Sequence, residues 1–240
     1  MERLDDLQLG NLKIYQDTEG FRFGIDSILL TEFAKDIKKN SRIVDLGTGT
    51  GVIGMLLCKK SNPKEVIGVE KQEEVCKLTQ KSIEINNLQN IFKLINCDIK
   101  DLKLNKNYYD VVITNPPYKK AGTGVDANNE KKQISRFETT ANLDDWIKVS
   151  SNLLNSQGSF YMVYRTERLA EVINTLNKYD LTLKKIRFVH SKANEESKLM
   201  LIKAVKQGRP SAKVEPPLII YDENGNYTKE VVEIYKNKNK

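Results

Sequence analysis

The segment with the clearest chemical meaning is Asn115-Pro116-Pro117-Tyr118, which directly follows an apolar run rich in β-branched residues that ends at Thr114. Such a run predicts a buried parallel strand, and open α/β sheets bind their ligands at the carboxyl ends of these strands. The Asn115 side-chain oxygen and the Pro116 carbonyl can both accept protons from a planar amino group, whose lone pair is delocalised. Accepting these protons favours a tetrahedral nitrogen and stabilises the positive charge that develops on it. The segment therefore predicts group transfer to an aromatic or amide nitrogen, with no strong general base.

The other residues of this segment suit the same chemistry. Each proline fixes φ and lacks an N–H group, so the turn is rigid and its carbonyls stay outside a strand ladder. Tyr118 is placed to offer a ring face to a base swung out of its stack, a contact worth about 1–3 kcal/mol. The structural alternative is that the two prolines only end a buried strand.

A second candidate site is the glycine-rich turn of Gly47, Gly49 and Gly51, which follows a predicted strand at 42–46. Glycines in such a turn let the backbone approach a ligand closely at the carboxyl edge of the sheet. Together with Gly54, two of them also satisfy the dinucleotide pattern G-x-G-x-x-G. The turn alone therefore leaves a nicotinamide-dependent dehydrogenase open as an alternative.

Acidic residues stand at the ends of the next two predicted strands. A carboxylate at Glu70 can accept hydrogen bonds from both hydroxyls of a ribose, and one at Asp98 can accept from an adenine amine. Either acid alone also fits a solvated strand end, and their joint placement favours a nucleoside site. Asp26 precedes an apolar helical pattern and occupies a position typical of a helix N-cap.

These motifs resemble those of class I S-adenosylmethionine-dependent methyltransferases. The run from Asp45 to Gly51 is similar to their motif I, residues 23–30 to the preceding cofactor-side motif, and 115–118 to the motif IV of amino-group methyltransferases. The resemblance implies S-adenosyl-L-methionine as cofactor and a catalytic role for Asn115, Pro116, Pro117 and Tyr118. The cofactor-binding residues that it implies are Asp26, Asp45, Gly47, Thr48, Gly49, Gly51, Glu70, Lys71, Asp98 and Asn115.

The chain further resembles the bacterial tRNA(1)(Val) adenine-37 N6-methyltransferase family. This resemblance is carried by 21–27, 115–118, 164–169, 190–195 and 199–203. It implies methylation of the exocyclic N6 amine of an adenine in tRNA, at adenosine 37 of a valine tRNA. The chain has Phe137-Glu138 where the family often has His-Glu. Motif IV itself leaves a release-factor glutamine, an rRNA base or a DNA adenine open as the substrate, and an idle RNA-binding module is the non-enzymatic alternative.

Alternating strand and helix patterns predict the fold. We expect a Rossmann-like, doubly wound α/β sheet of seven mostly parallel strands with an antiparallel last strand, because the last two strands lie too close for a helical crossover. The predicted strands are 42–46, 65–69, 91–96, 109–114, 159–164, 183–188 and 199–205, and the predicted helices are 52–60, 73–86, 143–154 and 167–178. An N-terminal hairpin is predicted from 12–15 and 20–23, and Trp146 is expected in the core.

The organisation that follows is one catalytic domain with short additions. We expect the N-terminal hairpin and helix at 1–40, the methyltransferase domain at 41–208, and a C-terminal extension at 209–240 with a docked strand and a frayed tail. Because no room remains for a separate recognition domain, RNA is expected to contact a mobile loop at 119–135. The basic residues around this loop are Lys119, Lys120, Lys131, Lys132 and Arg136.

The composition indicates which partners and which cellular compartment to expect. The formal net charge of +7 attracts phosphate backbones, although an AT-rich genome also enriches lysine. No apolar run has the length of a membrane span and no secretory leader is recognisable, so a cytoplasmic protein without a membrane partner is expected. The three cysteines form no C-x-x-C pair and there is one histidine, so neither a disulfide framework nor a metal site is predicted. No obligate protein partner is inferred.

Overall fold

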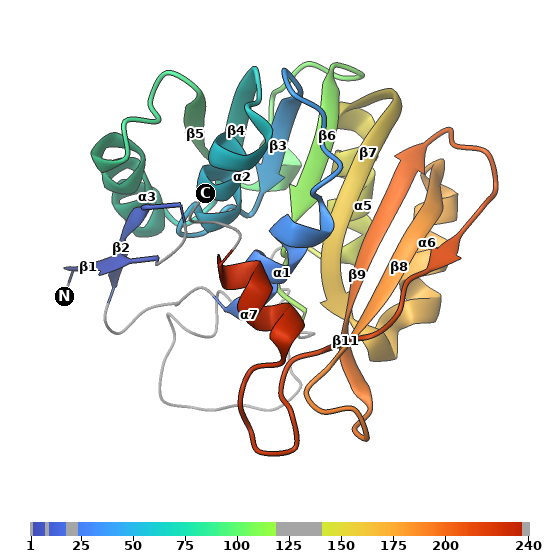
Figure 1. Cartoon of the computed structure of the whole chain (residues 1–240). Helices are drawn as coiled ribbons and strands as arrows, with labels where there is room; N and C mark the ends of the chain where they lie inside the picture. Colours follow the sequence, from blue (N-terminus) through green and yellow to red (C-terminus); the bar gives the residue numbers. More distant parts are fainter. Residues whose placement is uncertain (1, 8–9, 18–23, 119–140, 237–240) are drawn as a thin grey trace, which may run out of the picture.

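A central twisted sheet organises the protein (Figure 1). The structure is a computed structural model, and it describes residues 2–7, 10–17, 24–118 and 141–236. The sheet has nine strands in the order β10-β8-β9-β7-β6-β3-β4-β5, with β11 pairing beside β8. Its main strands are β3 Arg42–Leu46, β4 Glu65–Glu70, β5 Phe92–Asn96, β6 Tyr109–Thr114, β7 Leu154–Arg165, β8 Leu181–His190 and β9 Ser197–Lys206.

The pairing of these strands confirms the predicted Rossmann-like sheet. Strands β5, β4, β3, β6 and β7 are parallel to one another, whereas β9 is antiparallel to both β7 and β8. The expected count of seven strands is exceeded because two short strands, β10 Lys213–Val214 and β11 Leu218–Ile219, pair in parallel with β8. The predicted site residues lie at the carboxyl ends of β3, β4 and β6, the edge at which open α/β sheets bind ligands.

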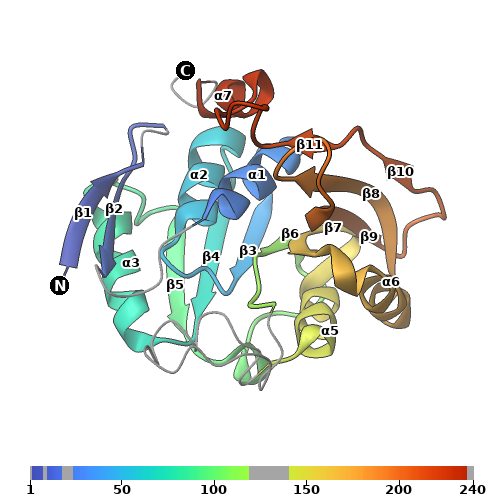
Figure 2. The same cartoon turned by 90° about the horizontal axis from the view of Figure 1, so that it is seen from below.

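Helices cover both faces of the sheet (Figure 2). The helices α1, α2 and α7 lie on one face, and α5 and α6 lie on the other. This double cover explains why the central strands are apolar without alternation: Ile43 belongs to the core on one face and Val44 to the core on the other. The helices are α1 Ile25–Phe33, α2 Val52–Ser61, α3 Glu73–Ile85, α5 Leu143–Leu153, α6 Leu169–Lys178 and α7 Lys229–Lys236.

The N-terminal hairpin is present, and its described strands are β1 and β2. Strand β2, Lys13–Asp17, overlaps the first predicted strand at 12–15 and pairs antiparallel with β1, Glu2–Asp6, a partner that the sequence pattern does not predict. The second predicted strand, at 20–23, lies outside the described residues. Gly10 and Asn11 both have positive φ, at 61° and 53°, which suits the tight turn between these strands. The hairpin packs against α3, where the backbone N–H of Tyr15 donates to the Ser82 hydroxyl at 2.9 Å.

The C-terminal extension differs from the expected frayed tail. After β10 and β11 have docked against β8, residues Lys229–Lys236 form the helix α7. Val231 is fully buried and Ile234 is 5% exposed, so this helix belongs to the same core as α1 and α2. In the described part of the chain, no helix combines the length and the apolar character needed to cross a membrane.

Candidate active site

The glycine turn between β3 and α2 has the conformation that its sequence suggests. Gly47, Gly49 and Gly51 have φ values of 67°, 55° and 78°, in the region that L side chains rarely adopt. Hydrogen bonds tie the turn to its surroundings; among them, the Thr48 N–H donates to the Val69 carbonyl at 2.9 Å, and the Thr79 hydroxyl donates to the Gly49 carbonyl at 2.7 Å. The backbone of the turn is therefore held in one shape at the sheet edge.

Trp146 explains why the first glycine of the turn tolerates no side chain. A Cβ atom at Gly47 would lie 2.8 Å from Cη2 of Trp146, which is closer than carbon atoms approach one another. Trp146 comes from α5 and is 6% exposed, which confirms the prediction that it belongs to the core. Its contact with the glycine turn is not visible in the sequence, because the two residues lie far apart in the chain.

Glu70 ends β4, as predicted, and lies against the glycine turn. One of its carboxylate oxygens accepts a hydrogen bond from the Gly49 N–H at 3.1 Å, and the other accepts from the Gln72 N–H at 2.8 Å. Burial raises the pKa of Glu70, against the opposing effect of these donors. Each oxygen keeps acceptor capacity for a further donor, such as a ribose hydroxyl.

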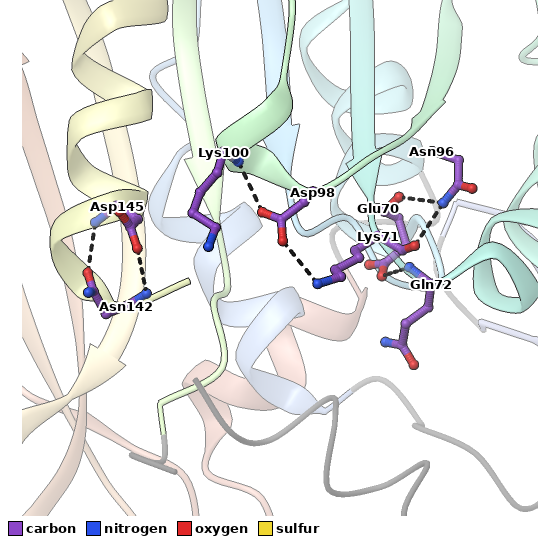
Figure 3. Close-up of polar contacts among 8 residues, drawn as sticks. All are labelled: Glu70, Lys71, Gln72, Asn96, Asp98, Lys100, Asn142 and Asp145. Atoms are coloured by element: carbon purple, nitrogen blue, oxygen red, sulfur yellow. Dashed lines mark hydrogen bonds and ion pairs between the residues drawn. The ribbon is translucent and has the colours of Figure 1, made fainter. Parts of the chain in front are cut away.

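Asp98 stands beyond the end of β5, and Lys71 spans the interval between Glu70 and Asp98 (Figure 3). The Asp98 carboxylate accepts from the Lys100 N–H at 3.0 Å, and from the Lys71 ammonium at 3.0 Å. Burial alone would raise the pKa of Asp98, but these two donors hold it below its ordinary value. The structure thus brings together the acidic residues that the sequence placed at successive strand ends.

Asp45 lies beneath the glycine turn and is fully buried. Its Oδ2 accepts from the Thr48 hydroxyl at 2.6 Å, whereas its Oδ1 has no hydrogen-bond partner among the residues that the structure describes. Burial raises the pKa of Asp45 to about 7, and the negative charge of Glu70 adds to this effect. Asp45 therefore shapes the turn from below and is sensitive to pH.

The segment Asn115–Tyr118 begins directly after the last residue of β6. The Asn115 Nδ2 donates to the Ser27 hydroxyl oxygen at 3.3 Å, while its Oδ1 is buried with no partner in the described residues. The Tyr118 hydroxyl donates to Asp26 at 2.6 Å, and the Tyr118 ring meets Tyr164 edge to face at 6.0 Å. The turn thus presents one unsatisfied acceptor next to an aromatic ring.

One expectation about this region is wrong, and another concerns residues outside the described ranges. Asp26 is not a helix N-cap: Gly24 occupies that position, and the Asp26 side chain in the first turn of α1 accepts from Tyr118 instead. The predicted RNA-contacting residues and Phe137-Glu138 all lie in the range 119–140, outside the described residues.

Comparison with known proteins identifies the family. The family model described as the methyltransferase small domain matches residues 24–192. The chain belongs to this family. The prediction made from the glycine turn and from 115–118 is thereby confirmed, and the chain is a methyltransferase. The family does not support the nicotinamide-dependent alternative that the glycine spacing left open.

Relatives with curated names match along most of the chain. A tRNA1(Val) (adenine(37)-N6)-methyltransferase of Actinobacillus succinogenes is 29% identical, over 92% of this chain and 91% of the relative. A protein of the same name from Haemophilus influenzae is 28% identical, over 93% of each chain.

Solved structures show the same fold. A predicted O-methyltransferase from Agrobacterium tumefaciens has a TM-score of 0.70 at 22% identity, with 89% of this chain and 96% of that chain covered. The tRNA m1G37 methyltransferase of M. jannaschii has a TM-score of 0.64 at 15% identity, over 87% of this chain and 57% of that one. These similarities confirm the class I methyltransferase fold.

The cofactor of class I methyltransferases, S-adenosyl-L-methionine, fits the residues at this edge of the sheet. A buried carboxylate with spare acceptor capacity at Glu70 suits ribose hydroxyls, and a positive-φ turn at 47–51 leaves backbone close to the ligand. The low pKa of Asp98 keeps a charged acceptor available for an amine donor. The chemistry of this donor set therefore matches an adenosyl group.

Proposed function

We propose that the chain transfers a methyl group from S-adenosyl-L-methionine to the exocyclic N6 amine of an adenine in tRNA, with adenosine 37 of a valine tRNA as the target. The observation that carries this proposal is the buried, unpartnered Oδ1 of Asn115 at the end of β6. An unsatisfied buried acceptor costs about 1–3 kcal/mol. A protein that keeps such an atom at the catalytic edge of its sheet has an acceptor ready for a donor on the substrate.

The amine of adenine supplies that donor. When bound, S-adenosyl-L-methionine supplies an electrophilic methyl group on a sulfonium. Asn115 Oδ1 and the Pro116 carbonyl accept the two amine protons, which localises the nitrogen lone pair and orients it toward the methyl group. The same acceptors stabilise the positive charge on nitrogen until one proton leaves to solvent. Tyr118 supplies an aromatic surface beside the reacting base.

The proposed binding of the cofactor uses the strand ends already described. Glu70 accepts hydrogen bonds from the ribose hydroxyls, and Asp98 accepts from the amine of the cofactor's adenine. The glycine turn lies under the amino-acid part, above Asp45 and Thr48. Lys71 fixes the position of Asp98 through the ion pair at 3.0 Å.

The choice of tRNA is supported by the names of the relatives and by the net charge of +7. An unpaired purine in a folded RNA requires less opening than a base in duplex DNA. We expect the basic residues at 119–136 to contact the RNA backbone and the domain at 41–208 to contribute to recognition. Transfer RNA as the substrate places the reaction in the cytoplasm.

The test is methyl transfer from labelled S-adenosyl-L-methionine to separate pools of tRNA, rRNA, DNA and release factor. Label in tRNA, recovered as N6-methyladenosine after nuclease digestion and mass spectrometry, supports the proposal. Label in release factor would indicate glutamine methylation, and no label in tRNA would defeat the tRNA assignment. Asn115→Ala should lower the rate of transfer about 100- to 1000-fold, whereas Asn152→Ala, an exposed position on α5, should leave it intact. An idle RNA-binding module would bind tRNA but label nothing.

A further inference from the structure

The first turn of α1 contacts both ends of the Asn115–Tyr118 segment. Two consecutive residues make these contacts: Ser27 accepts from the Asn115 Nδ2 at 3.3 Å, and Asp26 accepts from the Tyr118 hydroxyl at 2.6 Å. They lie 88 and 92 positions away from their partners in the sequence. A single helical turn therefore holds the beginning and the end of the segment at the same time.

The contact with Ser27 determines which atom of Asn115 is left for a ligand. A primary amide has two N–H donors and one acceptor oxygen. With Nδ2 directed at the Ser27 hydroxyl, Oδ1 remains as the buried atom that has no partner among the described residues. Ser27 itself is 7% exposed, so solvent does not compete freely for this hydrogen bond. The amide plane is thereby fixed before any substrate binds.

The contact with Asp26 acts on the tyrosine ring in a similar way. A carboxylate can only accept, so its bond to Tyr118 has one possible direction. The edge-to-face contact between Tyr118 and Tyr164 restrains the same ring from another side. Together, the two contacts hold the ring at a set angle beside Asn115. Rotation of either group by a small amount would misalign it with a reacting amine, and such errors can cost about 100-fold in rate.

We propose that Ser27 and Asp26 are positioning residues that act through Asn115 and Tyr118 respectively. This inference rests on the proposed amine methylation and extends it to two residues that are not expected to touch the reacting atoms. It also gives Asp26 a role other than the cofactor contact that its sequence motif implies.

The test for Ser27 is a double-mutant cycle measured by single-turnover transfer to tRNA with enzyme in excess. Ser27→Ala should lower the rate about 10-fold, because a loss of this size corresponds to the free energy of about one buried hydrogen bond. The affinities for tRNA and for S-adenosylhomocysteine should change little. In the Asn115→Ala background, the same change should have no further effect. Ser27→Thr, which restores a hydroxyl, should recover the rate.

A matched control separates positioning from a loss of stability. Ser61 is also 7% exposed and on a helix, and its hydroxyl donates to the Leu57 carbonyl at 2.9 Å, away from the segment. Ser61→Ala should therefore change thermal stability about as much as Ser27→Ala does, without lowering the rate. Equal rate losses in the two variants, or full additivity of Ser27→Ala with Asn115→Ala, would overturn the proposal for Ser27.

Asp26 is tested in the same way against Tyr118. Asp26→Ala should lower the rate in the wild-type background but not in Tyr118→Phe, which lacks the hydroxyl. A fall in S-adenosylhomocysteine affinity of equal size in both backgrounds would instead assign Asp26 to the cofactor and overturn its positioning role.

A further measurement does not depend on activity. In ¹⁵N-labelled protein, the side-chain amide signal of Asn115, assigned by its loss in Asn115→Ala, should shift in Ser27→Ala and not in Ser61→Ala. No shift would contradict the Ser27 contact. Absence of transfer by the wild type would contradict the proposed function alone.

Discussion

The carboxylate of Glu70 accepts a hydrogen bond from the backbone N–H of Gly49 at 3.1 Å, so the acid that ends β4 is joined to the turn that follows β3. The two elements most characteristic of the predicted cofactor site therefore form one unit. A change at the carboxylate should affect the shape of the turn as well as its own contacts with a ligand.

The first prediction concerns this carboxylate. Glu70→Gln replaces a charged acceptor by a neutral amide, and hydrogen bonds to charged groups contribute about 1.5–3 kcal/mol. We expect the affinity for S-adenosylhomocysteine, measured by calorimetry, to fall about 10- to 100-fold. Glu65→Gln is the matched control, because Glu65 begins the same strand at the opposite edge of the sheet. Equal losses in both variants would remove Glu70 from the cofactor site.

The second prediction uses the buried carboxyl of Asp45. Burial raises its pKa from 3.8 to about 7, so the folded state binds a proton between these values that the unfolded state releases. The contribution of Asp45 to the free energy of unfolding is therefore complete below pH 3.8 and is lost as pH rises toward 7. Asp45→Asn removes this dependence, so the variant should gain stability relative to the wild type between pH 5 and pH 8.

Urea denaturation of both proteins at the two pH values measures this difference. Asp36, Asp98, Asp110 and Asp144 have lowered pKa values and act in the opposite direction, but they are common to both proteins and cancel in the comparison. A stability difference that does not change with pH would show that Asp45 is ionised in the folded protein throughout this range.

The central sheet could be predicted from the sequence because buried parallel strands are continuous apolar runs with clear ends. The bounds of β3 and β6 agree with prediction at both ends. The pairing of β2 with β1 is not predicted, because a polar stretch after β2 suits a hairpin turn as well as Gly10-Asn11 does. The helix α7 was missed because only Val231 and Ile234 are buried in a stretch otherwise rich in charge, so the tertiary contacts that stabilise it are not visible locally.

In the candidate site, too, some residues can be placed from the sequence, whereas other contacts depend on tertiary packing. Glu70, Asp98 and the glycine turn could be placed because strand ends in a parallel sheet meet at one edge. The contacts of Ser27 with Asn115 and of Trp146 with Gly47 depend on how distant segments pack, and no local pattern encodes them. Asp26 was recognised as a functional candidate, but its partner, Tyr118, could not be derived from spacing.

The third prediction concerns the packing beneath the turn. Gly47→Ala combines a positive φ of 67° with a Cβ that would lie 2.8 Å from Cη2 of Trp146. We expect a lower melting temperature and a large loss of S-adenosylhomocysteine affinity, because either the turn or the indole must move. Gly225→Ala is the control: its φ is 84°, but no atom lies within 4 Å of the added Cβ, so only the backbone strain remains. Thermal unfolding should show a clearly smaller effect for Gly225→Ala, and similar effects would exclude the steric contribution of Trp146.

The last prediction separates the ring of Tyr118 from its hydroxyl. Tyr118→Ala removes the surface on which the target base is proposed to stack, which is worth about 1–3 kcal/mol, so kcat/KM for tRNA should fall about 10- to 100-fold. Tyr118→Phe keeps the ring and its edge-to-face contact with Tyr164 but loses the hydroxyl that donates to Asp26, so its effect should be smaller. The affinity for S-adenosylhomocysteine should stay unchanged in both variants, because the ring serves the substrate base.

Tyr108→Ala, at the other end of β6, removes a ring that lies 4.1 Å from the Arg42 guanidinium and should affect stability rather than kcat/KM. A loss of cofactor affinity in Tyr118→Ala as large as its loss of kcat/KM would place the ring on the cofactor side of the site and not under the base.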